Sequence, residues 1–193
     1  MQTMALRMRR KGIQVFIIAP LKGHEFYRAA RNVGGEFIQI SPASKNCINI
    51  MEIRKVDNSV NELLDGPTLD ASALAGKIQR LHIFFSLLIP DMSHEEKQLL
   101  DEALIKTYAR KGITHKNESL TDPQHPEQYK KMPILEDVYN VLLESEDTKR
   151  LAHILNRLVH GSASSFNQQT NVDLTNKYTV CLLYTSDAAD DKA

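Results

Sequence analysis

The sequence predicts an α/β fold in which a small parallel sheet is interrupted by a long helical insertion. Helical and strand patterns alternate over about the first 40 residues, which is typical of a parallel sheet with crossover helices. An apolar run of β type returns near the end of the chain, after a long stretch of helical periodicity. Hydrophobic residues make up 42% of the 193 residues and charged residues 25%, which excludes a disordered or fibrous protein.

The first elements alternate between helix and strand. Residues 2–11 end in basic side chains before Gly12, which is typical of a helix C-terminus because cations there favour the helix dipole. Residues 13–18 are apolar and rich in β-branched side chains, and they predict a strand buried on both faces. A helix is expected over 24–33, where two glycines follow it, and the alternating residues 36–40 predict a second strand.

The middle of the chain begins with two predicted helices. A short helix is expected over residues 58–65, where a Gly-Pro pair follows and breaks it. Residues 69–89 repeat apolar side chains every three or four positions, which predicts an amphipathic helix. Lys77 and Arg80 are expected elsewhere on the surface of this helix, away from its apolar face.

Further helices are predicted up to residue 159. Ser93 and Glu96 form a capping box, in which each side chain satisfies a backbone donor at the start of a helix. Residues 113–131 are polar and contain two prolines, so we expect a loop there. A helix is predicted to begin at Pro133, which suits a first helical position, and another is predicted over 146–159.

These patterns divide the chain into four parts: residues 1–56 of the sheet domain, a helical insertion over 57–175, a returning strand at 176–180, and a tail at 181–193. The tail reads CLLYTSDAADDKA, and we interpret it as a translated sequencing adapter because the match runs over many consecutive residues. Leu182 and Leu183 would then prolong the returning strand by accident. The alternative is a natural polar tail. The adapter interpretation implies that the chain is a fragment of a longer protein.

Charge and cysteine content limit the classes of function. The 24 basic and 24 acidic residues give a net charge of zero, which leaves only a local basic patch as a route to nucleic-acid binding. Cys47 and Cys181 form no CxxC pair, which favours a reducing, cytoplasmic setting. No apolar run reaches the roughly 20 residues that a transmembrane helix needs, and the N-terminus does not resemble a secretory signal.

The motifs of common nucleotide and zinc sites are absent from the sequence. It contains no G-x-x-x-x-G-K-[ST], no G-x-G-x-x-G and no H-E-x-x-H. The best candidate position for a ligand site is the loop after the first strand, because ligands of open α/β sheets bind at the carboxyl ends of strands. His24 and Glu25 are the titratable pair at this position. The alternative is that Glu25 only complements the dipole of the helix it begins.

Several segments together resemble the TraC-like and TrsE-like motor ATPases of conjugation and type IV secretion, the VirB/TraC-like group. The order and spacing of short motifs over nearly all of residues 1–180 carry this resemblance. The motifs are residues 12–20 with Glu25-Phe26, residues 34–38, Ile40-Ser41-Pro42 followed by Ile48-Asn49, Pro133-x-Leu135-x-Asp137, and Ser165-Phe166 followed by Thr170-Asn171-Val172.

The resemblance implies a partial RecA-like P-loop NTPase core with parallel strands and an inserted all-helical subdomain. It implies that the parent protein binds ATP and Mg²⁺ and works as a homo-oligomeric ring with other subunits of the secretion or conjugation apparatus. Contact with DNA and a cytoplasmic position, peripheral to the inner face of the cell membrane, are also implied. His24 and Glu25 would lie near the nucleotide, and no residue of the chain is expected to be catalytic or to bind a metal.

The sequence departs from this family in two respects. Ala19 stands where the family commonly has an acidic residue before a proline. Both nucleotide-hydrolysis motifs are expected outside the chain, the phosphate loop before Met1 and the acidic motif after Val180. We therefore expect these 193 residues to be inactive alone. The alternative function is a non-enzymatic helical protein-interaction module whose small α/β part is only structural.

Overall fold

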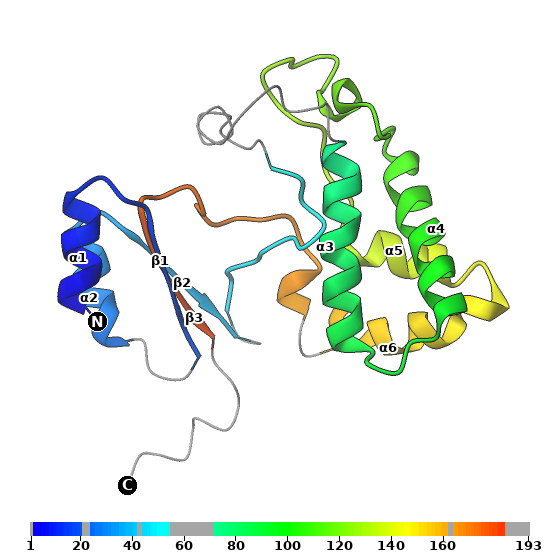
Figure 1. Ribbon diagram of the computed structural model, residues 1–193, viewed down its shortest axis with the longest axis horizontal. Coiled ribbons are helices and arrows are strands. Elements are labelled where there is room, and N and C mark those ends of the chain that lie inside the picture. Colours follow the sequence, from blue (N-terminus) through cyan, green and yellow to red (C-terminus); the bar gives the residue numbers. More distant parts are fainter. Residues whose placement is uncertain (1, 21–23, 42–43, 55–71, 162–163, 184–193) are drawn as a thin grey trace, which may run out of the picture. The chain divides into compact units, whose positions relative to one another are not determined.

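The computed structural model describes residues 2–20, 24–41, 44–54, 72–161 and 164–183 (Figure 1). The short helix expected over 58–65 lies outside these residues. The chain forms two compact units, one made of residues 1–48 and 162–193 and the other of residues 49–161. We call them the α/β unit and the helical unit.

The α/β unit contains a three-stranded parallel sheet in the order β1-β3-β2. Its strands are β1 (Val15–Ala19), β2 (Glu36–Ile40) and β3 (Tyr178–Leu183). The returning strand β3 lies between the two N-terminal strands, so that Val180 is opposite both Ile17 and Phe37. The sequence predicts the parallel direction correctly. Residues 181–183, assigned from sequence to the tail, continue β3: residues 181 and 182 pair with both neighbouring strands, and Leu183 pairs with Ile40 of β2.

One face of the sheet packs against α1 (Gln2–Arg10) and α2 (His24–Asn32). The buried residues of this layer come from both helices and from two strands: Ala5, Val15, Phe26, Ala30, Tyr178 and Val180. Their burial accounts for the apolar spacing that predicts the two helices, because one stripe of each helix faces the sheet.

The opposite face of the sheet is covered over β2 and β3 by irregular segments of the same unit. Ile38, Ile40 and Cys181 are buried there against apolar side chains that include Phe166 and Val172. On β1, by contrast, Phe16 is 47% exposed and Ile18 is 63% exposed. The prediction of a first strand buried on both faces is therefore wrong for the described residues, since β1 is an edge strand covered on one face.

Glycines close the connection between α2 and β2. Gly34 has a φ of +66°, and the Gly35 amide donates to the Ala30 carbonyl at 2.8 Å, so α2 ends in the left-handed turn that two successive glycines predict. A Cβ at Gly35 would lie 2.5 Å from the carbonyl oxygen of Tyr178. The missing side chain therefore lets the chain pass close to the start of β3.

Over its described residues, 49–54 and 72–161, the helical unit has four α-helices and two short 3₁₀ turns: α3 (Ala73–Leu88), α4 (His94–Arg110), η1 (Asn117–Leu120), α5 (Leu135–Leu142), η2 (Glu146–Thr148) and α6 (Lys149–Val159). A further turn, η3 (Ser164–Phe166), belongs to the α/β unit. The predicted apolar faces form the core of the helical unit, including Leu81, Phe85, Leu104, Leu135 and Leu155. The loop expected over 113–131 is irregular apart from η1 and an antiparallel bridge between Thr121 and Tyr129.

The helical unit begins at Asn49 and ends at Gly161. Residues 164–175 group with the sheet, whereas the sequence assigns 57–175 to the insertion. The predicted limit between residues 56 and 57 lies outside the described residues. Within the described residues, no helix is long and apolar enough to cross a membrane.

Candidate functional site

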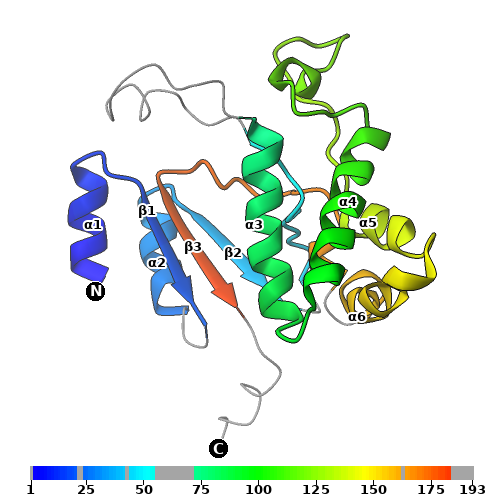
Figure 2. The ribbon, with the colours of Figure 1, turned by 45° about the vertical axis from the view of Figure 1, so that its right-hand side comes forward.

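The carboxyl ends of the three strands lie at one edge of the sheet, as Figure 2 shows. The last residues of the strands are Ala19, Ile40 and Leu183. In open α/β sheets this edge is where ligands bind, because the loops and helix N-termini that follow the strands gather there. The ligand site predicted from the sequence is assigned to this edge, because it follows the first strand.

The two residues predicted near a ligand begin α2. His24 is the first residue of the helix, and Glu25 is the second and is exposed. The backbone oxygen of Glu25 accepts a hydrogen bond of 2.6 Å from Nε2 of Gln2, the first residue of α1. The N-termini of α1 and α2 therefore lie side by side at this edge.

The Glu25 carboxylate has no hydrogen bond or ion pair with any described side chain. Its position in the first turn of α2 is favourable for the helix dipole, which was the alternative explanation for it. No group of three acidic, histidine or cysteine side chains among the described residues could hold a metal ion. A nucleotide-proximal role of His24 and Glu25 therefore stays a prediction.

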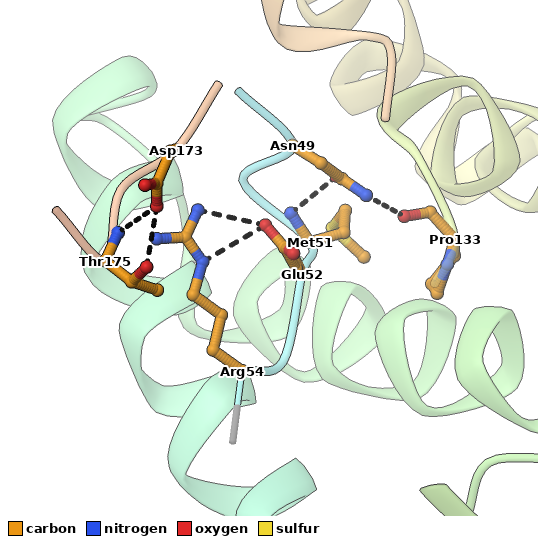
Figure 3. A network of polar contacts seen from close by, with 7 residues as sticks. All are labelled: Asn49, Met51, Glu52, Arg54, Pro133, Asp173 and Thr175. Carbon is orange, nitrogen blue, oxygen red and sulfur yellow. Dashed lines mark hydrogen bonds and ion pairs between the residues drawn. The ribbon is translucent and has the colours of Figure 1, made fainter. Parts of the chain in front are cut away.

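Two motifs that carry the family resemblance meet inside the helical unit (Figure 3). Asn49 is buried, and its Nδ2 donates to the carbonyl oxygen of Pro133 at 2.9 Å. Its Oδ1 accepts from the Met51 amide, also at 2.9 Å. The side chain of Asp137 accepts from the Ile134 amide at 2.8 Å and caps α5. These motif residues hold backbone segments in place, so their role is structural.

The motif that contains Asn171 also holds backbone segments in place, in this case within the α/β unit. Oδ1 of Asn171 accepts from the Cys47 amide at 2.7 Å, and its Nδ2 donates to the Lys45 carbonyl at 2.7 Å. Just before β3, the Asp173 carboxylate accepts hydrogen bonds from the hydroxyl and the amide of Thr175, which lower the pKa of Asp173 (Figure 3). The segment leading into the central strand is thus fixed by side-chain hydrogen bonds to backbone groups.

The sequence does not predict a group of charged residues in the helical unit. Arg54 donates to the Glu52 carboxylate from Nε at 3.1 Å and from Nη2 at 3.0 Å (Figure 3). The charges of Arg80, Arg54 and Glu52 affect the pKa of the Lys77 ammonium group. Burial, followed by the two arginines, lowers the pKa of Lys77 to about 8. The side chain of Lys77 is half-buried, whereas that of Arg80 is exposed.

Comparison with solved structures identifies a protein of similar fold. The model matches the structure of VirB4 of Thermoanaerobacter pseudethanolicus with a TM-score of 0.68 and 24% sequence identity, over 94% of this chain. The chain has the fold of that VirB4 region. It spans 63% of the length of the VirB4 chain. No protein-family model matches the sequence, and the search of curated proteins gives no match either.

Proposed function

We propose that the chain is part of a motor ATPase that powers conjugative DNA transfer or type IV secretion. The observation that carries the proposal is the likeness to VirB4 over 94% of the chain. Short sequence motifs independently resemble the VirB/TraC-like ATPases, and the likeness in fold extends over nearly the same residues. Two lines of argument, one from local motifs and one from backbone geometry, thus favour the same family.

In the parent protein, the α/β unit would be part of a RecA-like P-loop NTPase core. The helix α1 would be the rear of the helix that follows the phosphate loop. The hydrogen bond from Gln2 to Glu25 supports this, since it brings the N-terminus of α1 to the carboxyl edge of the sheet, beside α2. Phosphates bind well at such helix N-termini. His24 and Glu25 are proposed to lie near the nucleotide.

ATP and Mg²⁺ are proposed as cofactors of the parent protein. From the resemblance to the VirB/TraC-like ATPases, the ligands of Mg²⁺ are assigned to an acidic motif that follows Val180 in the parent protein. Hydrolysis by P-loop enzymes needs a backbone cradle, its lysine and a metal-holding acid together, because the reaction depends on positioning and charge stabilisation. The sequence has no G-x-x-x-x-G-K-[ST] motif. We therefore propose that the 193 residues alone do not turn over ATP.

The parent protein is proposed to act as a homo-oligomeric ring with other subunits of the secretion or conjugation apparatus. Its position would be cytoplasmic and peripheral to the inner face of the membrane.

The second candidate function is a helical protein-interaction module without enzymatic activity. The side chains of Ile83 and Leu87 on α3 favour it, because they are apolar and 64% and 78% exposed.

The test compares ATP turnover by three purified proteins. They are the 193-residue chain, a version extended at both ends along the natural gene, and the extended version with the phosphate-loop lysine replaced by alanine. We expect turnover in the extended protein only. Turnover by the short chain would contradict the proposed loss of the hydrolysis machinery. An extended protein that neither binds nor hydrolyses ATP would favour the interaction module.

A further inference from the structure

The amino edge of the sheet, at the opposite end of the strands from the candidate ligand site, gathers the C-termini of α1 and α2 (Figure 2). Two hydrogen bonds fix this arrangement. The Val15 amide donates to the Lys177 carbonyl at 2.9 Å, and Nδ2 of Asn176 donates to the Gly34 carbonyl at 3.0 Å. The start of β1, the segment before β3 and the turn after α2 are therefore held side by side.

Basic side chains concentrate at this edge. Three belong to the end of α1, two to α2, and one to the segment that leads into β3. All of these side chains are exposed. We call the group the basic edge, and its members are Arg7, Arg10, Lys11, Arg28, Arg31 and Lys177.

No ion pair neutralises the basic edge within the described residues. Every ion pair that these residues form belongs to the helical unit, where Lys106 and Arg150, for example, are bound by carboxylates. The adjoining segments contribute the carboxylates of Glu36 and Asp173, and that of Asp173 accepts hydrogen bonds from Thr175. Six cations against two carboxylates leave an excess of four positive charges.

The helix dipoles account for only part of this charge. A helix C-terminus carries about half a negative charge, so the two helix ends offset about one of the four. The remaining cations repel one another. Arg7 and Arg10 are three residues apart, as are Arg28 and Arg31, and like charges at this spacing destabilise a helix. An anionic partner would offset this cost.

We propose that the basic edge binds the phosphate backbone of a nucleic acid, independently of the base sequence. Four of its six cations are arginines, whose planar guanidinium groups match pairs of phosphate oxygens. The exposed amide side chains of Gln14 and Asn32 lie beside them, and such amides also donate to phosphate and sugar oxygens. The basic edge is the local patch that a chain of zero net charge needs for such binding.

A nucleic acid fits this surface better than an anionic membrane does. A helix surface that binds lipid carries several exposed apolar side chains beside its cations. Among residues 7–14 and 28–34, Ile13 is the one apolar residue that is exposed. The inference does not rest on the ATPase proposal, because the nucleotide is assigned to the other edge of the sheet. DNA binding is measured without ATP, and ATP turnover is measured without DNA, so failure of one is distinguishable from failure of the other.

The experiment titrates a fluorescent DNA duplex of mixed sequence with the full 193-residue chain and measures anisotropy at several salt concentrations. The test variant is Arg10→Gln with Lys11→Gln. The matched control is Lys97→Gln with Arg157→Gln, which removes the same two side-chain types from exposed positions of α4 and α6. A third variant, Arg10→Lys with Lys11→Arg, keeps the charge of the basic edge.

Circular dichroism checks that each variant is folded. Lys177→Gln provides a second test that changes no helix, because Lys177 lies in the irregular segment before β3.

We expect the unchanged chain to bind the duplex with an affinity that falls as salt rises. The test variant should bind at least about tenfold more weakly at about 50 mM salt, because each lost phosphate contact releases one counterion fewer. The slope of log affinity against log salt should fall by about two for this variant and by about one for Lys177→Gln. The control and the charge-keeping variant should retain the slope of the unchanged chain.

The proposal is overturned if the unchanged chain does not bind the duplex at about 50 mM salt. It is also overturned if the control lowers the slope as much as the test variant does. Vesicles that contain phosphatidylserine test the rival partner. If the test variant loses binding to these vesicles while its binding to DNA is unchanged, the basic edge is a membrane surface and the proposal is wrong.

Discussion

The side-chain amide of Asn49 donates to the carbonyl oxygen of Pro133, 84 residues further along the chain, at 2.9 Å. Asn49 is 2% exposed, so this bond and the one it accepts from the Met51 amide are shielded from water. The bond joins the extended segment before α3 to the residue that leads into α5. Two segments that are distant in the sequence are thus held together by one buried side chain.

Replacing Asn49 by alanine should lower the free energy of unfolding by about 2–3 kcal/mol. The change leaves the buried Pro133 carbonyl and Met51 amide without this partner, and each unsatisfied group costs about 1–3 kcal/mol before relaxation. Urea unfolding followed by circular dichroism measures the effect. Asn140→Ala, at an exposed position of α5, is the control and should change stability by less than about 0.5 kcal/mol. Equal effects of the two variants would contradict the role given to Asn49.

Gly35→Ala should destabilise the α/β unit more than Gly34→Ala. A Cβ at Gly35 meets the Tyr178 carbonyl at 2.5 Å, and relieving such a contact costs about 1–3 kcal/mol. At Gly34 the Cβ meets nothing within 4 Å, so only the strain of a φ of +66° is added, about 1 kcal/mol. Thermal unfolding of both variants gives the comparison, and the reverse order would show that β3 does not pass Gly35 closely.

Tyr108→Phe should remove part of the loss of stability at alkaline pH. The Tyr108 hydroxyl donates to the Met51 carbonyl at 2.5 Å inside the helical unit, and burial raises the pKa of this hydroxyl. An acid whose folded pKa is raised contributes stability below its unfolded pKa, near 10, and this is lost as pH rises further. Between pH 8 and 11.5, the free energy of unfolding should decline more steeply for the wild type than for the variant. Tyr139→Phe, on α5, is the control and should leave the steep decline intact.

The wild-type protein should gain stability with rising pH because of Lys77, the opposite direction to the effect of Tyr108, and Lys77→Met should remove this gain. The folded pKa of Lys77, about 8, lies below the ordinary value of 10.5, so the folded protein gains stability as pH rises from 8 to 10.5. The gain should be about 1–3 kcal/mol, after allowance for the exposed part of the side chain. The variant lacks this gain and should be the more stable protein at pH 7. A pH profile identical to that of the wild type would contradict the assigned environment of Lys77.

Ser93→Ala should weaken the start of α4 by about 1 kcal/mol. The Ser93 hydroxyl accepts from the Glu96 amide at 3.1 Å, and the Glu96 carboxylate accepts from the Ser93 amide at 2.9 Å. The Ser93 amide, followed by Arg150, lowers the pKa of Glu96. The stability from Glu96 is therefore lost as pH falls below 4.5, its ordinary value. Helical circular dichroism during urea unfolding measures the change. Ser86→Ala, at an exposed position of α3, should have little effect.

Local patterns predict much of the fold. The capping box of Ser93 and Glu96 marks the start of α4 because it depends on residues three apart. The order of the sheet is not predictable in this way, since β3 is inserted between β1 and β2 by contacts over more than 130 residues. For the same reason, the apolar run of residues 13–18 could not reveal that Phe16 and Ile18 are exposed on an edge strand.

The candidate site is predictable only in part. The position of His24 and Glu25 at the start of a helix follows from the pattern of residues 24–33. The hydrogen bond between Gln2 and Glu25, which places α1 beside α2, requires tertiary structure. The influence of Arg54 and Glu52 on the pKa of Lys77 could not be predicted, because these charges come from a segment more than 20 residues earlier in the chain.

Sequencing the natural gene across both ends of this reading frame tests the proposed origin of the chain most directly. We predict an in-frame G-x-x-x-x-G-K-[ST] motif within about one or two helical turns before Met1, and an acidic motif at the end of a strand after Val180. An in-frame stop codon shortly before Met1, with no lysine-bearing glycine loop, would contradict the assignment to a motor ATPase.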